Sequence, residues 1–151
     1  MRAAAHPLRT GYMPAHTTMT NSSLEVTILN KIARFRQTAC HNQRGKCFYC
    51  RQPMWERDVS AFARKHGLRL KEARRFKATA EHLSARSEGG GDVMENIVAA
   101  CWFCNSHRHR VKHPLCPKTF AQQVRRRLHQ GRWHGFIAKP ETAERSSLKV
   151  I

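Results

Sequence analysis

The sequence predicts an α+β fold in which two short strands pack with several helices around one small core. Apolar residues recur at helical spacing in residues 24–35 and 120–128, and residues 79–83 and 97–100 have the composition of strands. Two matched cysteine pairs, separated by 50 residues, indicate a metal site that joins distant parts of the chain. A chain of 151 residues fits one domain and can bury about 70% of its unfolded surface.

The chain is strongly basic, with 28 Lys and Arg against 10 Asp and Glu and a net charge of +18. This imbalance indicates a polyanionic partner, most often nucleic acid or an anionic membrane surface. The longest apolar run, Ile97–Cys104, has eight residues, whereas a membrane-spanning helix needs about 20. No apolar leader is present near the start, so we expect a cytoplasmic protein in which cysteines stay reduced and bind metal.

The N-terminal part divides into a tail and a helix. Residues 1–23 contain no acidic residue and little apolar periodicity, which predicts a disordered basic tail. Ser23 is a suitable N-cap for a following helix. Its apolar face is expected to consist of Leu24, Ile28, Ile32 and Phe35. A turn is expected at residues 42–46.

The segment between the cysteine pairs predicts two helices, two strands and a loop. The first helix begins after the N-cap Asp58 and ends near Gly67, and residues 70–77 suggest a short basic helix. The two strands, 79–83 and 97–100, flank a polar loop at 84–92. We expect its glycines, Gly89–Gly91, to serve a tight turn that needs positive φ.

Two further helices are predicted after the second cysteine pair. The first spans residues 105–113 and is closed by Pro114. The second spans residues 119–130, with Gly131 at its end. Its inward face is expected to consist of Phe120, Val124 and Leu128.

The cysteine pairs are both C-x-x-C motifs, Cys47/Cys50 and Cys101/Cys104. Two residues between cysteines let one tight turn supply two ligands, and two such turns complete a tetrahedral four-thiolate zinc site. Thioredoxin-like redox chemistry is the competing interpretation, but it needs one such motif at the start of a βαβ unit, and two are present here without that pattern. Cys40 and Cys116 are interpreted as free thiols without a role.

Polar residues that can support hydrolysis cluster around the second pair. Glu81-His82 lie on the first predicted strand and Asn96 precedes the second, while Asn105 and His109 are one helical turn apart. These motifs, with the glycine loop and the sequence Cys101-Trp102-Phe103-Cys104-Asn105, resemble the HNH endonuclease family in its form with a four-cysteine zinc site. The resemblance covers residues 47–109, and residues 51–77 correspond to an insertion.

The resemblance implies a ββα-metal core with His82 as the general base. The unperturbed pKa of histidine, near 6.5, suits proton transfer from water at neutral pH. Glu81, Asn105 and His109 offer a carboxylate, a carbonyl oxygen and an imidazole nitrogen, a set that suits Mg²⁺ or Mn²⁺ and admits other divalent cations. Asn96 is expected to brace the loop. The sequence departs from the family pattern at Glu81, where Asp is common, and at Asn105.

The C-terminal third carries the densest positive charge. Residues 105–135 contain eight Lys or Arg and no acidic residue. The expected contacts to a nucleic-acid backbone, which position a duplex without recognising its sequence, are Arg108, Arg110, Lys112, Arg125, Arg126 and Arg127. His107 is expected to be solvated, with a phosphate contact as the alternative. Trp102, Phe103 and Trp133 could stack on bases, but Trp102 and Phe103 are expected to pack in the core.

Together these features predict one nuclease domain at residues 24–135, followed by a tail at 136–151. Its motif core spans 47–113 and its helical insertion 57–77. The favoured function is a metal-dependent endonuclease that hydrolyses DNA, with one structural Zn²⁺ and a catalytic Mg²⁺ or Mn²⁺. A non-catalytic zinc-containing protein that binds nucleic acid is the alternative, and the oligomeric state stays open.

Overall fold

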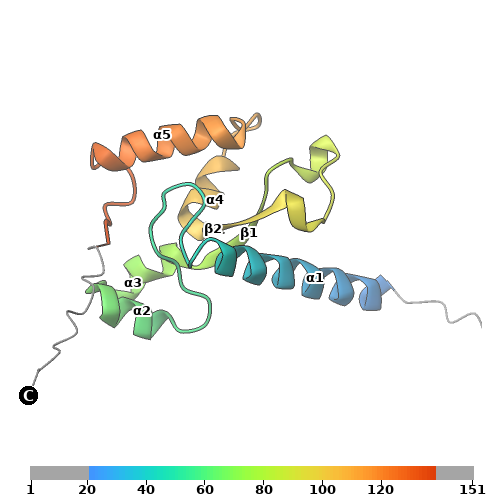
Figure 1. Cartoon of the computed structure of the whole chain (residues 1–151), viewed down its shortest axis with the longest axis horizontal. Coiled ribbons are helices and arrows are strands. Elements are labelled where there is room, and N and C mark those ends of the chain that lie inside the picture. The colour runs from blue at the N-terminus through green and yellow to red at the C-terminus, as the bar shows by residue number, and fades with distance from the viewer. Residues whose placement is uncertain (1–20, 139–151) are drawn as a thin grey trace, which may run out of the picture.

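The structure, a computed structural model, describes residues 21–138 and consists of helices arranged around a small two-stranded sheet (Figure 1). This arrangement confirms the predicted α+β class. The predicted tails fall largely on residues 1–20 and 139–151, which lie outside the described residues.

The sheet is a hairpin of β1 (Ala78–His82) and β2 (Ile97–Cys101), paired antiparallel with His82 opposite Ile97. Both strands lie within a residue or two of their predicted positions. The side chains of Ala78, Ala99 and Ala100 are buried, because small residues let helices approach the sheet closely. The loop between the strands contains two 3-10 turns, Arg86–Glu88 and Met94–Asn96.

Helix α1 (Asn21–Asn42) packs against both strands and begins two residues before the predicted Ser23. Its last turn is fixed to the sheet by Gln43, whose side chain donates to the Ala99 carbonyl at 2.8 Å and accepts from the Ala99 amide at 2.9 Å. In Figure 1 the sheet lies between α1 below and α4 above. The two strands therefore pack against α1 and against α4.

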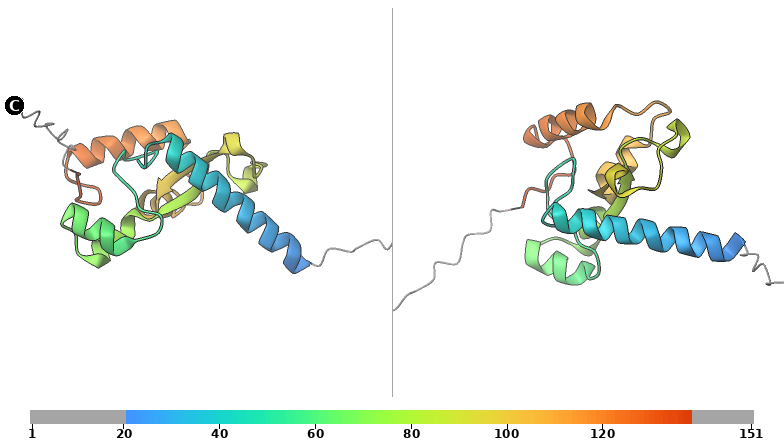
Figure 2. Two further views of the ribbon diagram at one scale, coloured as in Figure 1. Left: turned by 60° about the horizontal axis from the view of Figure 1, so that its bottom comes forward. Right: turned by 45° about the vertical axis from the view of Figure 1, so that its right-hand side comes forward.

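The insertion forms α2 (Val59–His66), α3 (Leu70–Ala73) and a 3-10 turn at Arg74–Phe76, which lie together at one end of the molecule (Figure 2). Asp58 caps α2 as predicted, because its Oδ1 accepts from the amides of Ser60 and Ala61, both at 2.8 Å. Gly67 ends α2 in the left-handed conformation, with φ 62°. Phe62 and Phe76 carry the buried face of the insertion.

Helix α4 (Trp102–Arg108) differs from the predicted helix at 105–113 by starting and ending earlier. It starts earlier because Cys101 caps it, its Sγ accepting from the Cys104 amide at 3.4 Å. It ends earlier because residues 109–113 offer no apolar face to hold a helix, and Val111 is 57% exposed.

Helix α5 (Pro117–His129) begins two residues before the predicted start, with Pro117 in its first turn. Phe120, Val124 and Leu128 are buried as predicted, and Gly131 follows the helix with φ 66°. The Phe120 ring packs edge-on against Tyr49, with ring centroids 4.9 Å apart. Helix α5 therefore covers the first C-x-x-C motif.

The fold continues beyond the predicted domain end at residue 135. The Phe136 ring lies edge-on to Phe76 with centroids 4.9 Å apart, and the Ala138 amide donates to the Gln52 side chain at 2.8 Å. None of the described helices combines the length and hydropathy that a membrane-spanning segment needs.

Candidate functional site

The four predicted cysteine ligands meet at one buried point. The Sγ atoms of Cys47, Cys50, Cys101 and Cys104 all lie within 4.8 Å of one another. In a tetrahedral site with Zn–S bonds of about 2.3 Å, sulfur atoms are about 3.8 Å apart, so the cluster needs only a small contraction to hold Zn²⁺. The four thiolates are thus arranged to bind a metal, and their soft, tetrahedral donor set is compatible with zinc.

Hydrogen bonds from N–H groups surround these sulfur atoms. The Cys101 amide donates to Cys47 Sγ at 3.2 Å, and the Trp133 indole donates to Cys104 Sγ at 3.3 Å. Burial raises the pKa of Cys47, but hydrogen bonds from the other cysteines outweigh it and hold the pKa well below its ordinary value. Such donors stabilise thiolates and orient them toward a metal. Trp133, which the sequence offered as a base-stacking residue, instead contributes to this site.

The remaining two cysteines lie apart from this cluster. Cys40 is buried in α1, and burial raises the pKa of its thiol to about 11. Cys116 is exposed at the start of α5, where the Thr119 hydroxyl, 3.1 Å away, lowers the pKa of its thiol.

The carboxylate of Glu81 is the centre of the second cluster and is only 1% exposed. Its Oε1 accepts from the Tyr49 hydroxyl at 2.8 Å and from Arg108 Nη1 at 2.6 Å. Its Oε2 lies 3.0 Å from His109 Nε2. Two donors therefore occupy one carboxylate oxygen, while the other faces the histidine.

Tyr49 and Arg108 fix this carboxylate from opposite parts of the chain. Burial and the charge of Glu81 raise the pKa of Tyr49, so its hydroxyl remains a donor. Arg108 is 3% exposed and also donates to the backbone carbonyls of His82, Leu83 and Leu115. The prediction that Arg108 contacts a nucleic-acid backbone is therefore wrong, because its charge is directed inside the protein at Glu81.

His109 and Asn105 occupy different positions around Glu81. His109 is the C-cap of α4 and its side chain is 41% exposed, whereas Glu81 is buried. The Asn105 amide nitrogen donates to Thr79 Oγ1 and to the Ala80 carbonyl, both at 3.0 Å. Asn105 thus lies against β1 beside Glu81, and only its carbonyl oxygen remains for a further ligand.

His82 pairs with a residue that the sequence did not select. Its Nε2 lies 2.7 Å from Asp92 Oδ1, and Arg86 binds the same carboxylate through two contacts of 2.9 Å. These hydrogen bonds, from His82 and then from Arg86, lower the pKa of Asp92. The only sequence signal for Asp92 was an acidic residue directly after three glycines.

Asn96 lies at the base of this loop, as the sequence predicted for a bracing residue. Its Oδ1 accepts from the Ser84 amide at 2.8 Å, and its Nδ2 donates to the carbonyls of Ser84 and Gly91 at 3.1 and 3.0 Å. Gly89 adopts φ 85°, as the predicted tight turn requires.

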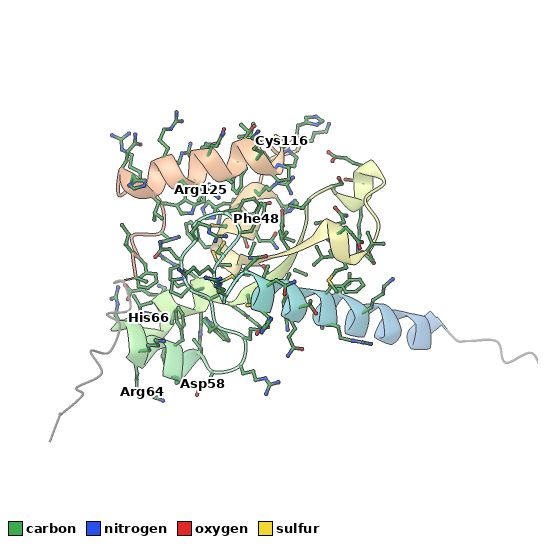
Figure 3. All side chains as sticks on the ribbon, viewed as in Figure 1. Phe48, Asp58, Arg64, His66, Cys116 and Arg125 are labelled. Carbon is green, nitrogen blue, oxygen red and sulfur yellow. The ribbon has the colours of Figure 1, made fainter. Side chains whose placement is uncertain are left out.

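The other predicted contact residues lie on the surface. Arg110, Lys112, Arg126 and Arg127 are exposed, and Arg125 is exposed although its Nε donates to the Tyr49 carbonyl at 3.3 Å. Figure 3 shows Arg125 on α5, and Cys116 directly before the helix, above Phe48. These three residues line a groove of about 480 Å³ with Lys118 and with Leu83, which directly follows His82.

The aromatic residues of α4 separate in the fold. Trp102 is 48% exposed, so its predicted core position is wrong, because the first turn of α4 faces solvent there. Phe103 packs against the core as predicted. His107 stacks on Phe103, with ring centroids 3.9 Å apart, and its Nδ1 lies 2.7 Å from the Phe103 carbonyl. Its Nε2 lies 3.3 Å from Arg110 Nη1, and burial lowers its pKa, so His107 is partly buried rather than solvated as expected.

The described residues thus form a strand–loop–strand–helix unit with four cysteines positioned to bind a metal and with a carboxylate and two histidines around its first strand. Residues 71–110 match the family model described as HNH endonuclease, the family that the sequence motifs resemble. The match includes β1, β2 and α4 but not the first C-x-x-C motif. No curated protein and no solved structure matched the chain significantly.

Proposed function

We propose that this protein is a metal-dependent endonuclease that hydrolyses DNA phosphodiester bonds. The observation that carries the proposal is the pair of Glu81 Oε2 and His109 Nε2, which lie 3.0 Å apart, with the carboxylate buried and the His109 side chain partly exposed. His82 follows Glu81 on β1, and we assign it the role of the base. A protein that only bound nucleic acid would need neither group in this arrangement.

The Glu81–His109 spacing fits a divalent cation. Ligands on adjacent corners of an octahedron at about 2.1 Å from the metal are about 3.0 Å apart. The oxygen of Glu81, the nitrogen of His109 and the carbonyl oxygen of Asn105 would hold Mg²⁺ or Mn²⁺. Such a cation supplies positive charge that stabilises the charge developing on the phosphate and on the leaving oxygen.

The protein side chains have separate tasks in this proposal. His82 takes the proton from the attacking water, and Asn96 keeps the loop in place beside it. Tyr49 and Arg108 occupy Glu81 Oε1, so that only Oε2 is presented to the cation. The charges of Glu81 and Arg108 cancel, so the protein side of the site attracts a cation only weakly. We infer that a phosphate group of the bound DNA supplies further negative charge that helps to hold the cation.

DNA is the proposed substrate and partner because of the charge around the site. Arg125 and Lys118 line the groove that reaches Leu83, next to His82. The neighbouring exposed groups proposed to contact phosphates are Arg110, Lys112, Arg126 and Arg127. Contacts of this kind bind the backbone without base recognition, and a cytoplasmic location remains a prediction.

A plasmid-cleavage assay tests the proposal. Zinc-bound protein is incubated with supercoiled DNA and Mg²⁺, Mn²⁺ or EDTA, and binding is measured on the same samples by gel shift. We expect wild type to cut only with added cation, and His82→Ala to bind but cut at least about 100-fold more slowly. His113→Ala, which removes an exposed histidine, serves as the matched control and is expected to cut normally.

The alternative function is a nucleic-acid-binding protein without turnover. The observation that favours it is the ion pair of 2.6 Å between Arg108 and Glu81, which reduces the negative charge available to a cation. This alternative predicts that wild type and His82→Ala bind DNA equally and that neither cuts any nucleic acid tested. Cleavage that depends on both His82 and added cation would eliminate it.

A further inference from the structure

The loop between the strands places an acidic residue, Asp92, against His82, the proposed base. The chain leaves β1 at His82 and comes back ten residues later, where Asp92 Oδ1 lies 2.7 Å from His82 Nε2. Arg86, within the same loop, binds the Asp92 carboxylate through Nε and Nη2, both at 2.9 Å. The three side chains form a chain of contacts from an exposed arginine to a histidine that is 17% exposed.

Hydrogen bonds and a close backbone contact fix the conformation of the loop between His82 and Asp92. Asn96 bonds to the backbone at both ends of it, at Ser84 and at Gly91. A Cβ at Gly90 would lie 1.9 Å from the Ser84 carbonyl oxygen, so only glycine allows the two backbone segments to approach this closely. The shape of the glycine loop therefore places Asp92 beside His82.

The chemistry of a carboxylate determines what this contact does. An ionised carboxylate accepts hydrogen bonds and cannot donate them, so the ring proton of His82 must be on Nε2. The contacts with His82 and Arg86 lower the pKa of Asp92 and keep it ionised. Nδ1 of the neutral ring is then the nitrogen with a free lone pair.

We propose that Asp92 is a positioning residue, which fixes the orientation and tautomer of His82 so that Nδ1 is the basic atom, with Arg86 holding Asp92 in turn. This inference rests on the proposed function. In the hydrolysis a water proton moves to Nδ1 while the water oxygen bonds to phosphorus. The bond from phosphorus to the leaving sugar oxygen breaks, its electron pair stays on that oxygen, and solvent supplies the proton.

The first test reads the His82 ring directly and does not depend on cleavage. In ¹⁵N-labelled protein, above the pH at which the ring is protonated, we expect wild type to show a proton on Nε2 that is shifted downfield and protected from exchange. Asp92→Ala should lose this protected signal. Glu88→Gln, which removes an exposed carboxylate from the same loop, should keep it. A wild-type ring protonated on Nδ1, or an unchanged signal in Asp92→Ala, would overturn the proposal.

The second test measures cleavage by the same variants with supercoiled plasmid and Mn²⁺. We expect Asp92→Ala to lower kcat about 10- to 100-fold with KM little changed, since the base is displaced while the binding surface stays intact. Arg86→Gln keeps the His82–Asp92 contact and should lose less activity than Asp92→Ala, and Glu88→Gln should match wild type. Equal losses in Arg86→Gln and Asp92→Ala, with the melting temperature lowered to the same extent, would indicate a role in loop stability alone and refute the proposal.

Asp92→Asn is a second variant at this position, needed in case Asp92→Ala does not fold. It preserves the shape and one acceptor oxygen but has no charge, so we expect a weaker Nε2 proton signal and a smaller loss of kcat than in Asp92→Ala. A kcat equal to wild type in both Asp92 variants would refute the positioning role. If wild type cleaves nothing, the proposed function fails, while the ring spectrum still decides whether Asp92 fixes the tautomer.

Discussion

Arg108→Met tests whether the buried ion pair with Glu81 stabilises the domain. Both partners are almost fully buried, at 3% and 1% exposure, and their closest atoms lie 2.6 Å apart. Removal of Arg108 leaves a buried carboxylate without its cation, which costs about 3–5 kcal/mol of the free energy of unfolding. The three backbone contacts of Arg108 are 3.3–3.4 Å long, so their removal adds comparatively little. Since a domain has about 5–15 kcal/mol in total, the variant should be strongly destabilised.

The assay is urea unfolding of four zinc-bound proteins: wild type, Arg108→Met, Glu81→Gln and the double variant. Because the double variant has no unpaired buried charge, it should be more stable than Arg108→Met, and the coupling energy should be about 1–3 kcal/mol. Arg126→Met, at an exposed position, is the matched control and should change stability by less than about 0.5 kcal/mol. A decrease below about 1 kcal/mol in Arg108→Met would refute the reasoning, because it would mean that the buried carboxylate of Glu81 does not need Arg108 as its partner.

Three further predictions concern metal, DNA and pH. Cys104→Ser should lower bound zinc from about one ion per chain to near zero by elemental analysis and should melt at lower temperature, whereas Cys116→Ser, outside the cluster, should retain the ion. Replacing Arg125, Arg126 and Arg127 with Gln should weaken DNA binding and reduce the slope of log K against log salt by about 0.9 for each phosphate that no longer pairs with an arginine; an unchanged slope would place the DNA elsewhere. Burial lowers the pKa of His134 to about 4, so the unfolded chain binds its proton first as pH falls below about 6.5. The free energy of unfolding should therefore drop by about 1 kcal/mol between about pH 7 and pH 5.5, and His134→Phe should flatten this limb in urea titrations.

Local chemistry accounts for most of the elements that the sequence predicted correctly. The cap of α2 depends on Asp58 and Gly67, which act on backbone groups within three or four residues, and the buried face of α5 follows from a regular spacing. The two C-x-x-C motifs are also local, because each supplies two ligands from one turn. Interactions over such short distances are visible in the order of residues alone.

The partners of charged and aromatic groups depended on contacts across the fold. Arg108 and Trp102 both occur in a basic, aromatic segment, yet one is buried against Glu81 and the other is exposed. Periodicity does not distinguish them, because the difference is set by which side of α4 faces β1. Helix α4 ended early for a related reason, since the exposed residues 109–113 have no apolar face that could pack against the rest of the fold.

The sequence by itself determined the chemical inventory of this protein: a four-thiolate frame, a carboxylate with histidines, and a large positive charge. Only the tertiary structure decided how these groups are paired. Tyr49 and Arg108 share one oxygen of Glu81, and Asp92 meets His82 across a loop braced by Asn96. The physical reason is that burial and the charged and hydrogen-bonding groups within about 6 Å govern a side chain's charge and protonation, and residues distant in sequence supply those groups.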